Sequence, residues 1–194
     1  MSTYRLLIII ASFALVFSAC SGGADQNTSG NQAANTAPAA DAGPTPSNQI
    51  TEGDVAKLKW LEGSWRGMVG DKPFYERIRF EGSTMIVESF EDGSMSNVTE
   101  TGTFELKDGE WGHSAGTQRS AASSITDDMV QFVPAKVPGA PEGGTVKGGM
   151  FRFERKENGT WLAVLDVPAS RDKPASQTVY KMEPWKAVSK GSTK

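Results

Sequence analysis

The chain has 194 residues, and its 20 Lys and Arg against 23 Asp and Glu give a formal net charge of −3. This mild acidic balance argues against a nucleic-acid-binding protein, because such proteins usually carry a basic excess. The sequence holds one Cys and one His. It therefore excludes a disulfide framework within the chain and any multi-Cys or multi-His metal site, and it offers little for Cys/His or Ser/His catalysis. We predict no metal, no other cofactor and no nucleic-acid partner.

The first residues have the features of a secretory signal. A short segment carrying Arg5 precedes an apolar run from Leu6 to Phe17, and small residues follow before Cys20. A membrane-spanning helix needs about 20 apolar residues to cross a hydrocarbon core of about 30 Å, and this run is shorter. Residues 1–19 are therefore predicted to be a signal peptide rather than a permanent membrane span.

The sequence Phe17-Ser18-Ala19-Cys20 resembles the lipobox of bacterial lipoproteins. The resemblance implies that Cys20 is acylated, with palmitate among its lipids, and becomes the first mature residue. Ser21, rather than Asp, follows the Cys, which by the same resemblance implies anchoring in the outer membrane on its periplasmic face. The alternative is an ordinary signal peptide cleaved near Ala19 that leaves a free thiol.

Residues 21–49 contain no aromatic, no large apolar side chain and no Lys or Arg. Such a segment cannot bury enough surface to offset its ordering entropy. We therefore predict a lipid-anchored disordered linker over 20–50, a folded domain over 51–186 and a flexible tail over 187–194.

The folded domain is predicted to open with a short helix. Thr51 is a suitable N-cap, and Asp54 lies three residues later, as in a capping box. Apolar residues then follow at helical spacing, which predicts a helix over 54–61 that ends at Gly63.

The rest of the domain has the pattern of antiparallel strands. Apolar and polar residues alternate, and three turn dipeptides separate the candidate strands: Asp92-Gly93, Asp108-Gly109 and Asn158-Gly159. Asn-Gly and Asp-Gly favour two-residue hairpin turns, because both turn positions need positive φ. We predict an all-β protein, an antiparallel up-and-down β-barrel of about 8–10 strands with a short N-terminal helix, since closure removes exposed sheet edges.

The segment from Trp60 to Gly67 carries Gly63-Ser64-Trp65 directly after the predicted helix, and it resembles the opening of lipocalin-like (calycin) barrels. The resemblance implies that Trp65 closes one end of the barrel, with a basic residue from a late strand, Lys181 or Arg155, over its ring. The Trp185 side chain, near the end of the chain, is expected to contribute little.

The segment from Phe74 to Phe80 resembles the second strand of nitrobindin-like domains, which bind haem through a late His. Since no His follows His113, the haem ligand is not carried over to this chain. The segment 134–149, rich in Pro and Gly, is predicted to be a long loop, either a flap over the open end of the barrel or an inert insertion.

Four residues are candidates for ligand binding: Glu76, His113, Arg119 and Tyr180. Glu76 shares a strand face with Phe74 and Ile78, so it is either a polar anchor inside the barrel, a partner of an inward Arg, or a strand-end residue near solvent. His113 is a general base, a lone metal ligand or a structural residue. Arg119 is a polar residue in a strand-like context, and Tyr180 is one of the few polar side chains of the last strands.

These features predict a lipid-anchored envelope protein, monomeric and non-enzymatic, that holds a small, mainly apolar ligand in its barrel. The first alternative is an envelope interaction or maintenance protein with a packed barrel. A third hypothesis, a hydrolase-type enzyme, would require Glu76, His113 or Tyr180 to cluster in one pocket.

Overall fold

The computed structural model describes residues 44–137, 139, 149–167, 169 and 174–187. Cys20, the predicted signal peptide, the linker as far as residue 43, most of the loop 134–149 and the end of the tail lie outside the described residues. Within the described residues, no helix is long and apolar enough to cross a membrane.

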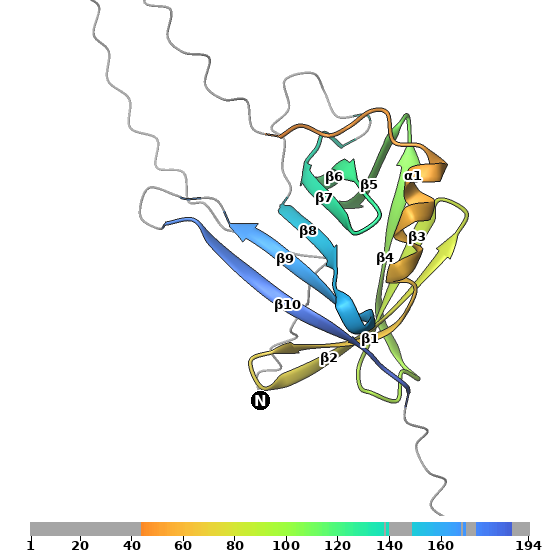
Figure 1. Cartoon of the computed structure of the whole chain (residues 1–194), viewed down its shortest axis with the longest axis vertical. Coiled ribbons are helices and arrows are strands. Elements are labelled where there is room, and N and C mark those ends of the chain that lie inside the picture. Colours follow the sequence, from red (N-terminus) through yellow and green to blue (C-terminus); the bar gives the residue numbers. More distant parts are fainter. Residues whose placement is uncertain (1–43, 138, 140–148, 168, 170–173, 188–194) are drawn as a thin grey trace, which may run out of the picture.

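In the part of the chain that the structure describes, ten antiparallel strands form one closed up-and-down barrel, which confirms the predicted fold class (Figure 1). Each strand pairs with the next along the chain, and the last pairs with the first. The strands are β1 (Gly63–Val69), β2 (Lys72–Glu81), β3 (Thr84–Phe90), β4 (Val98–Lys107), β5 (Glu110–Ala115), β6 (Gln118–Ile125), β7 (Met129–Pro134), β8 (Met150–Arg155), β9 (Trp161–Val167) and β10 (Ser176–Pro184).

The closure between β1 and β10 is short. Only Trp65↔Pro184 and Arg66↔Glu183 pair across it, whereas β10 pairs with β9 from Ser176 to Met182. Figure 1 shows β10 diverging from the β1–β2 hairpin beyond this crossing. The barrel is thus closed tightly at the end where β1 begins and is splayed towards the other end.

The predicted helix forms, with changed bounds. An α-helix, α1 (Glu52–Ala56), continues into a 3-10 helix, η1 (Lys57–Leu61). The capping box is confirmed, because the Thr51 hydroxyl accepts from the Asp54 N–H at 3.2 Å and the Asp54 carboxylate accepts from the Thr51 N–H at 3.1 Å. The helix predicted over 54–61 begins two residues earlier, and in its second half the chain tightens to 3-10 geometry, with Leu58 and Leu61 in the core.

The three turn dipeptides have different outcomes. Asp108 and Gly109 have φ of 52° and 78° and form the predicted two-residue turn between β4 and β5. Asn158 and Gly159 also have positive φ, but they lie within a longer connection that contains the 3-10 turn η2 (Glu157–Gly159). β3 and β4 pair as the predicted hairpin, but the two-residue turn at Asp92-Gly93 is wrong, since β3 ends at Phe90 and β4 begins at Val98.

Local contacts explain the longer connection after β3. The Asp92 carboxylate accepts from the Ser94 N–H at 2.8 Å, and Met95, at φ 52°, is 5% exposed. The carbonyl of Gly93 accepts a hydrogen bond from the Trp185 indole at 2.9 Å. The loop is therefore held by its own turn, by a buried side chain and by the end of the chain.

Trp65 lies at the closed end of the barrel, as predicted, and is 6% exposed. Its indole N–H donates to the carbonyl of Leu61 at 2.7 Å, and its ring meets the ring of Trp161 edge to face, with centroids 5.9 Å apart. Gly63, two residues earlier, has φ of 143°, a conformation that side chains disfavour. In the Gly-x-Trp pattern, the Gly thus allows the backbone conformation at the start of β1, and the Trp fills the closed end of the barrel.

The prediction that a basic residue lies over the Trp65 ring is wrong. The Lys181 side chain is 59% exposed and its amine pairs with Glu183 at 3.1 Å, while Arg155 is exposed. Strand alternation turns Lys181 outward, because its neighbour Met182 faces the core. Trp161 from β9 therefore covers the ring instead.

Trp185 has more contacts than its place near the end of the chain suggested. Its backbone N–H donates to the carbonyl of Ser64 at 2.8 Å. Its ring packs on the Tyr75 ring with centroids 5.1 Å apart, and the Arg66 guanidinium lies 5.2 Å from its ring centroid. These contacts count against the expectation that it contributes little, since they join the end of β10 to β1, β2 and the loop after β3.

The packed chain also begins earlier than the predicted boundary at residue 51. The N–H of Ser47 donates to Ala122 and that of Ile50 donates to Gly109, both at 2.9 Å. A Cβ on Gly109 would lie 2.1 Å from the Asn48 carbonyl oxygen. The segment before the helix therefore lies directly against the barrel wall.

Candidate binding site inside the barrel

Much of the barrel interior is filled by aromatic rings. Neighbouring rings lie with centroids 4.4 to 6.4 Å apart, close enough for stacked and edge-to-face contacts. The cluster, which we call the aromatic cluster, comprises Phe104, Trp111, Phe132, Phe151, Phe153 and Trp161. This part of the interior is core.

Glu76 is a buried carboxyl among apolar side chains. It lies on β2 between Phe74 and Ile78, opposite Trp65 on β1, and is 2% exposed. Its Oε1 has no hydrogen-bond partner. Burial, and secondarily the nearby Glu100 carboxylate, raise the pKa of Glu76 to about 8. Of the three alternatives from the sequence, the inward Arg partner and the solvent-exposed strand end do not match this position.

A second carboxyl follows in the same row across the sheet. Glu76 pairs with Ser89 on β3, and Ser89 pairs with Glu100 on β4. Glu76 and Glu100 are thus two strands apart, roughly 10 Å between backbones, and their long side chains can approach each other over the small Ser89. We call Glu76, Ser89 and Glu100 the acidic row; the strands that carry it lie side by side in Figure 1.

No buried basic group faces the acidic row among the described residues. Strand alternation directs Arg77, next to Glu76, outward to Glu88, at 3.6 Å. The described basic residues on the inward-facing strand positions are Lys72 and Arg155, and both are exposed at strand ends. The described interior thus carries two acidic groups and no buried cation.

Tyr180 lies close to the acidic row. Its ring meets the ring of Phe74 edge to face, with centroids 5.9 Å apart. Phe74 in turn occupies the space above Gly67, since a Cβ at that glycine would lie 2.2 Å from the far carbon of the Phe74 ring. Of the four candidates, Tyr180 thus contacts Phe74, which shares the inward face of β2 with Glu76, beside the splayed β1–β10 closure.

This packing predicts a clear effect of enlarging Gly67. Gly67→Ala is expected to displace Phe74 and to lower the free energy of unfolding by about 1–3 kcal/mol, as overpacking does in other cores. Chemical denaturation measures it. Gly149→Ala, where no atom lies within 4 Å of the added Cβ, is the matched control. Equal stability of the two variants would contradict the close packing of Phe74 on β1.

His113 lies next to the aromatic cluster in the barrel interior. Its Nδ1 donates to the carbonyl of Thr103 at 2.8 Å, and its ring lies 5.1 Å from that of Phe104. These contacts are those of a structural histidine. Among the described residues, no group of three or more His, Cys, Asp or Glu is placed to hold a metal ion.

Arg119 lies on the outer side of β6, because the alternate residues Ser120 and Ala122 belong to the inward face. It is 5% exposed, and its guanidinium donates to Ser114 and Glu110, both at 3.3 Å. Arg119 is therefore separated by the barrel wall from Glu76.

The sequence did not single out Glu100 or Gly67. Glu100 lies at the same alternate positions of β4 as Gly102 and the buried Phe104, which could have indicated an inward position. Its place beside Glu76 depends on the register of β3 against β4, which includes an irregularity at Ser89 and Phe90.

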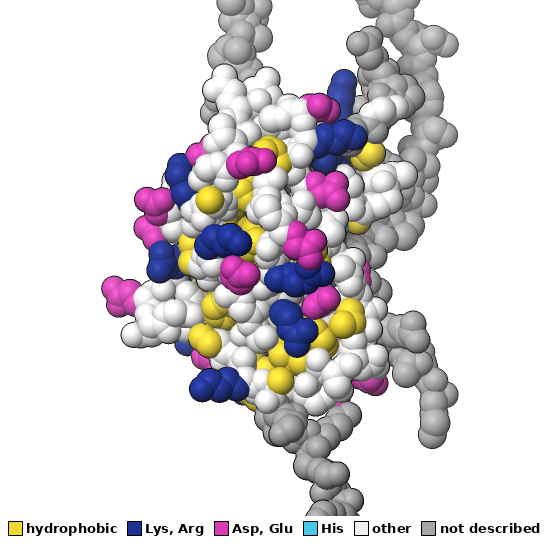
Figure 2. All heavy atoms as spheres, turned by 90° about the vertical axis from the view of Figure 1, so that its right-hand side faces the viewer, with side chains coloured by type: hydrophobic (Ala, Val, Ile, Leu, Met, Phe, Trp, Pro, Cys, Tyr) yellow, Lys and Arg dark blue, Asp and Glu magenta, His cyan; other side chains and the backbone are white. Residues whose placement is uncertain are grey.

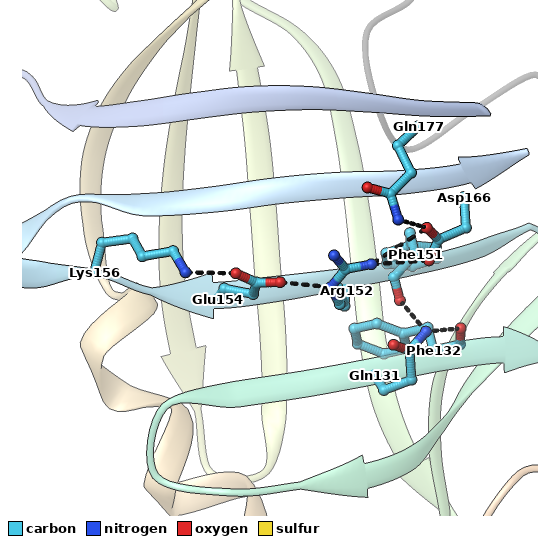
Figure 3. Close-up of polar contacts among 8 residues, drawn as sticks. All are labelled: Gln131, Phe132, Phe151, Arg152, Glu154, Lys156, Asp166 and Gln177. Atoms are coloured by element: carbon cyan, nitrogen blue, oxygen red, sulfur yellow. Dashed lines mark hydrogen bonds and ion pairs between the residues drawn. The ribbon is translucent and has the colours of Figure 1, made fainter.

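Charged groups on the outer wall contrast with Glu76. Figure 2 shows Lys and Arg interspersed with Asp and Glu on one face. On β8 and β9, Arg152 pairs with Glu154 at 2.5 Å and with Asp166 at 3.1 Å, and Lys156 and Gln177 extend this network (Figure 3). The hydrogen bonds from Lys156 and then Arg152 lower the pKa of Glu154.

A hollow of about 540 Å³ lies at the ends of β9 and β10, lined by Met150, Asp166, Val167, Ala175, Ser176 and Gln177. It contains none of the candidate residues. Its carboxylate, Asp166, already accepts hydrogen bonds from Arg152 and Gln177, so the acidic row is the stronger candidate site.

In comparisons with known proteins, no family model and no curated protein matches this chain.

Proposed function

We propose that this protein is a non-enzymatic binding protein that holds a small, mainly apolar ligand inside its barrel, next to Glu76. The observation that carries the proposal is the buried Glu76 carboxyl with an unpartnered Oε1. A buried polar group without a partner costs roughly 1–3 kcal/mol or more, and such costly groups are typical of functional sites. A ligand donor would supply the missing hydrogen bond.

The surroundings favour binding over hydrolysis. Phe74, Ile78 and Tyr180 provide apolar walls, and ligand sites typically combine such walls with few polar groups. A hydrolase would need an activated nucleophile with a base, and His113 is instead engaged with Thr103 and Phe104. The packed-barrel alternative draws support from the aromatic cluster, which fills a large part of the interior.

Native mass spectrometry of the protein purified from its own envelope tests the proposal. We expect a small molecule to be retained and to be lost from a Ser89→Phe variant, because the new ring would fill the acidic row. Thr101→Phe is the matched control, since Thr101 is exposed on the outer face of β4. If neither the parent nor the control retains a molecule, the packed-barrel alternative is favoured.

We also propose that Cys20 is lipidated and holds the barrel at the periplasmic face of the outer membrane. Cys20→Ser is expected to abolish incorporation of labelled palmitate and to move the protein from the membrane fraction to the soluble fraction. Metabolic labelling and fractionation measure both effects. Unchanged labelling of the variant would contradict lipidation at this residue.

A further inference from the structure

We propose that the ligand is an organic cation, an apolar molecule carrying an ammonium group that pairs with Glu76 and Glu100 of the acidic row. This inference rests on the proposed function and specifies its ligand class. Three observations support it: the unpartnered carboxyl of Glu76, the second inward carboxyl, and the lack of a buried cation around them in the described interior.

The two carboxyls select for positive charge. Glu76 is 2% exposed and Glu100 is half-buried, so both lie in a region of low effective dielectric where charge interactions are strong. An anionic ligand would be repelled by Glu100 and would oppose ionisation of Glu76. A neutral ligand would leave Glu76 protonated, whereas an ammonium group would favour its ionised form and would face both carboxyls.

Aromatic rings stand beside the acids. Phe74 is two residues from Glu76 on the same inward face, and Tyr180 meets Phe74 edge to face. An ammonium group is attracted to the face of an aromatic ring, so rings next to carboxylates form a suitable environment for a cation. The apolar part of the molecule would lie against Ile78 and Val87, which belong to the core.

The proposal requires Glu76 to be ionised in the complex. The neighbouring strands present few groups to it: β1 presents Trp65, β3 presents Ser89, β4 presents Glu100 and β10 presents Tyr180, and of these four only Glu100 and Tyr180 are titratable. Because burial and Glu100 raise its pKa to about 8, Glu76 is largely protonated at pH 7 without ligand. Binding of a permanent cation should therefore displace one proton, and affinity should rise by about tenfold per pH unit up to about pH 8.

Three probes of similar size separate charge from apolar contact. Benzyltrimethylammonium carries a permanent positive charge, neopentylbenzene is its neutral analogue, and phenylmethanesulfonate is an anion. Saturation-transfer NMR titrations of the purified full-length protein at pH 6, 7, 8 and 9 give the affinity for each. We expect the cation to bind at least tenfold more tightly than the neutral probe at pH 8, with the pH dependence described above.

Glu76→Gln should remove most of the preference for the cation and its pH dependence, while leaving affinity for the neutral probe unchanged. Glu100→Gln should reduce the preference by a smaller factor. Glu105→Gln, an exposed outward position on β4, is the matched control and should behave as the parent. Thermal unfolding of each variant verifies that the barrel is intact.

The outcomes distinguish a failure of the cation inference from a failure of the proposed binding function. Equal affinity for the cation and the neutral probe would overturn the cation inference and leave the apolar binding function standing. Binding of none of the probes would count against both. A cation preference that survives in Glu76→Gln and in Glu100→Gln would show that the acidic row is not its origin and would also overturn the inference.

Discussion

Replacing Trp65 with alanine is expected to cause the largest loss of stability of any single substitution considered for this barrel. Trp65 is 6% exposed, its indole donates to Leu61 at 2.7 Å, and its ring packs on Trp161. Truncation of a buried Trp typically costs about 3–5 kcal/mol, and the total stability of a domain is only about 5–15 kcal/mol. We therefore expect a sharply lowered midpoint of thermal unfolding, or no folded protein.

Two controls identify the cause. Trp65→Phe keeps a ring against Trp161 but loses the hydrogen bond to Leu61, so it should be intermediate. Met68→Ala on the same strand removes a side chain that is 44% exposed and should change stability little. Circular dichroism during heating measures all three variants. A Trp65→Ala barrel as stable as Met68→Ala would show that Trp65 does not close the barrel end.

Glu76 should make the stability of the barrel fall as the pH rises. The pKa of this carboxyl is 4.5 ordinarily and about 8 in the folded protein, so between these values the folded state binds more protons than the unfolded state. Stability contributed by the neutral acid is then fully present below about pH 4.5 and is lost as the pH rises through about 8. The expected loss is at most about 1.4 kcal/mol per pH unit, or about 5 kcal/mol in all.

The variant Glu76→Gln isolates this effect because its side chain does not titrate. The difference in free energy of unfolding between the variant and the parent should be small at pH 5 and should favour the variant increasingly towards pH 8. Urea denaturation at each pH measures it, and Glu105→Gln serves as the exposed control. A pH-independent difference would mean that Glu76 is ionised, and therefore compensated, in the folded barrel.

The sequence by itself determined the class of fold, because local patterns decide it. Alternation of apolar residues, the capping box at Thr51 and the Asp108-Gly109 turn each involve neighbours in the chain, and each is present in the structure. The burial of Trp65 was implied by the resemblance of Gly63-Ser64-Trp65 to the opening of known barrels, and in the structure its indole donates to Leu61 at the end of the helical segment. Patterns of this kind need no knowledge of which strands meet.

The tertiary structure alone decided which residues form the candidate site. Glu76 and Glu100 share a row because β3 lies between β2 and β4 in one register, and a shift by one residue would turn either carboxyl outward. Tyr180 reaches Phe74 only because the last strand closes on the first, over a separation of more than a hundred residues. The same closure brought Trp185 onto Tyr75 and placed Trp161, rather than a basic residue, over Trp65. Contacts between strands distant in sequence depend on register and closure, which the amino-acid pattern of a single strand does not encode.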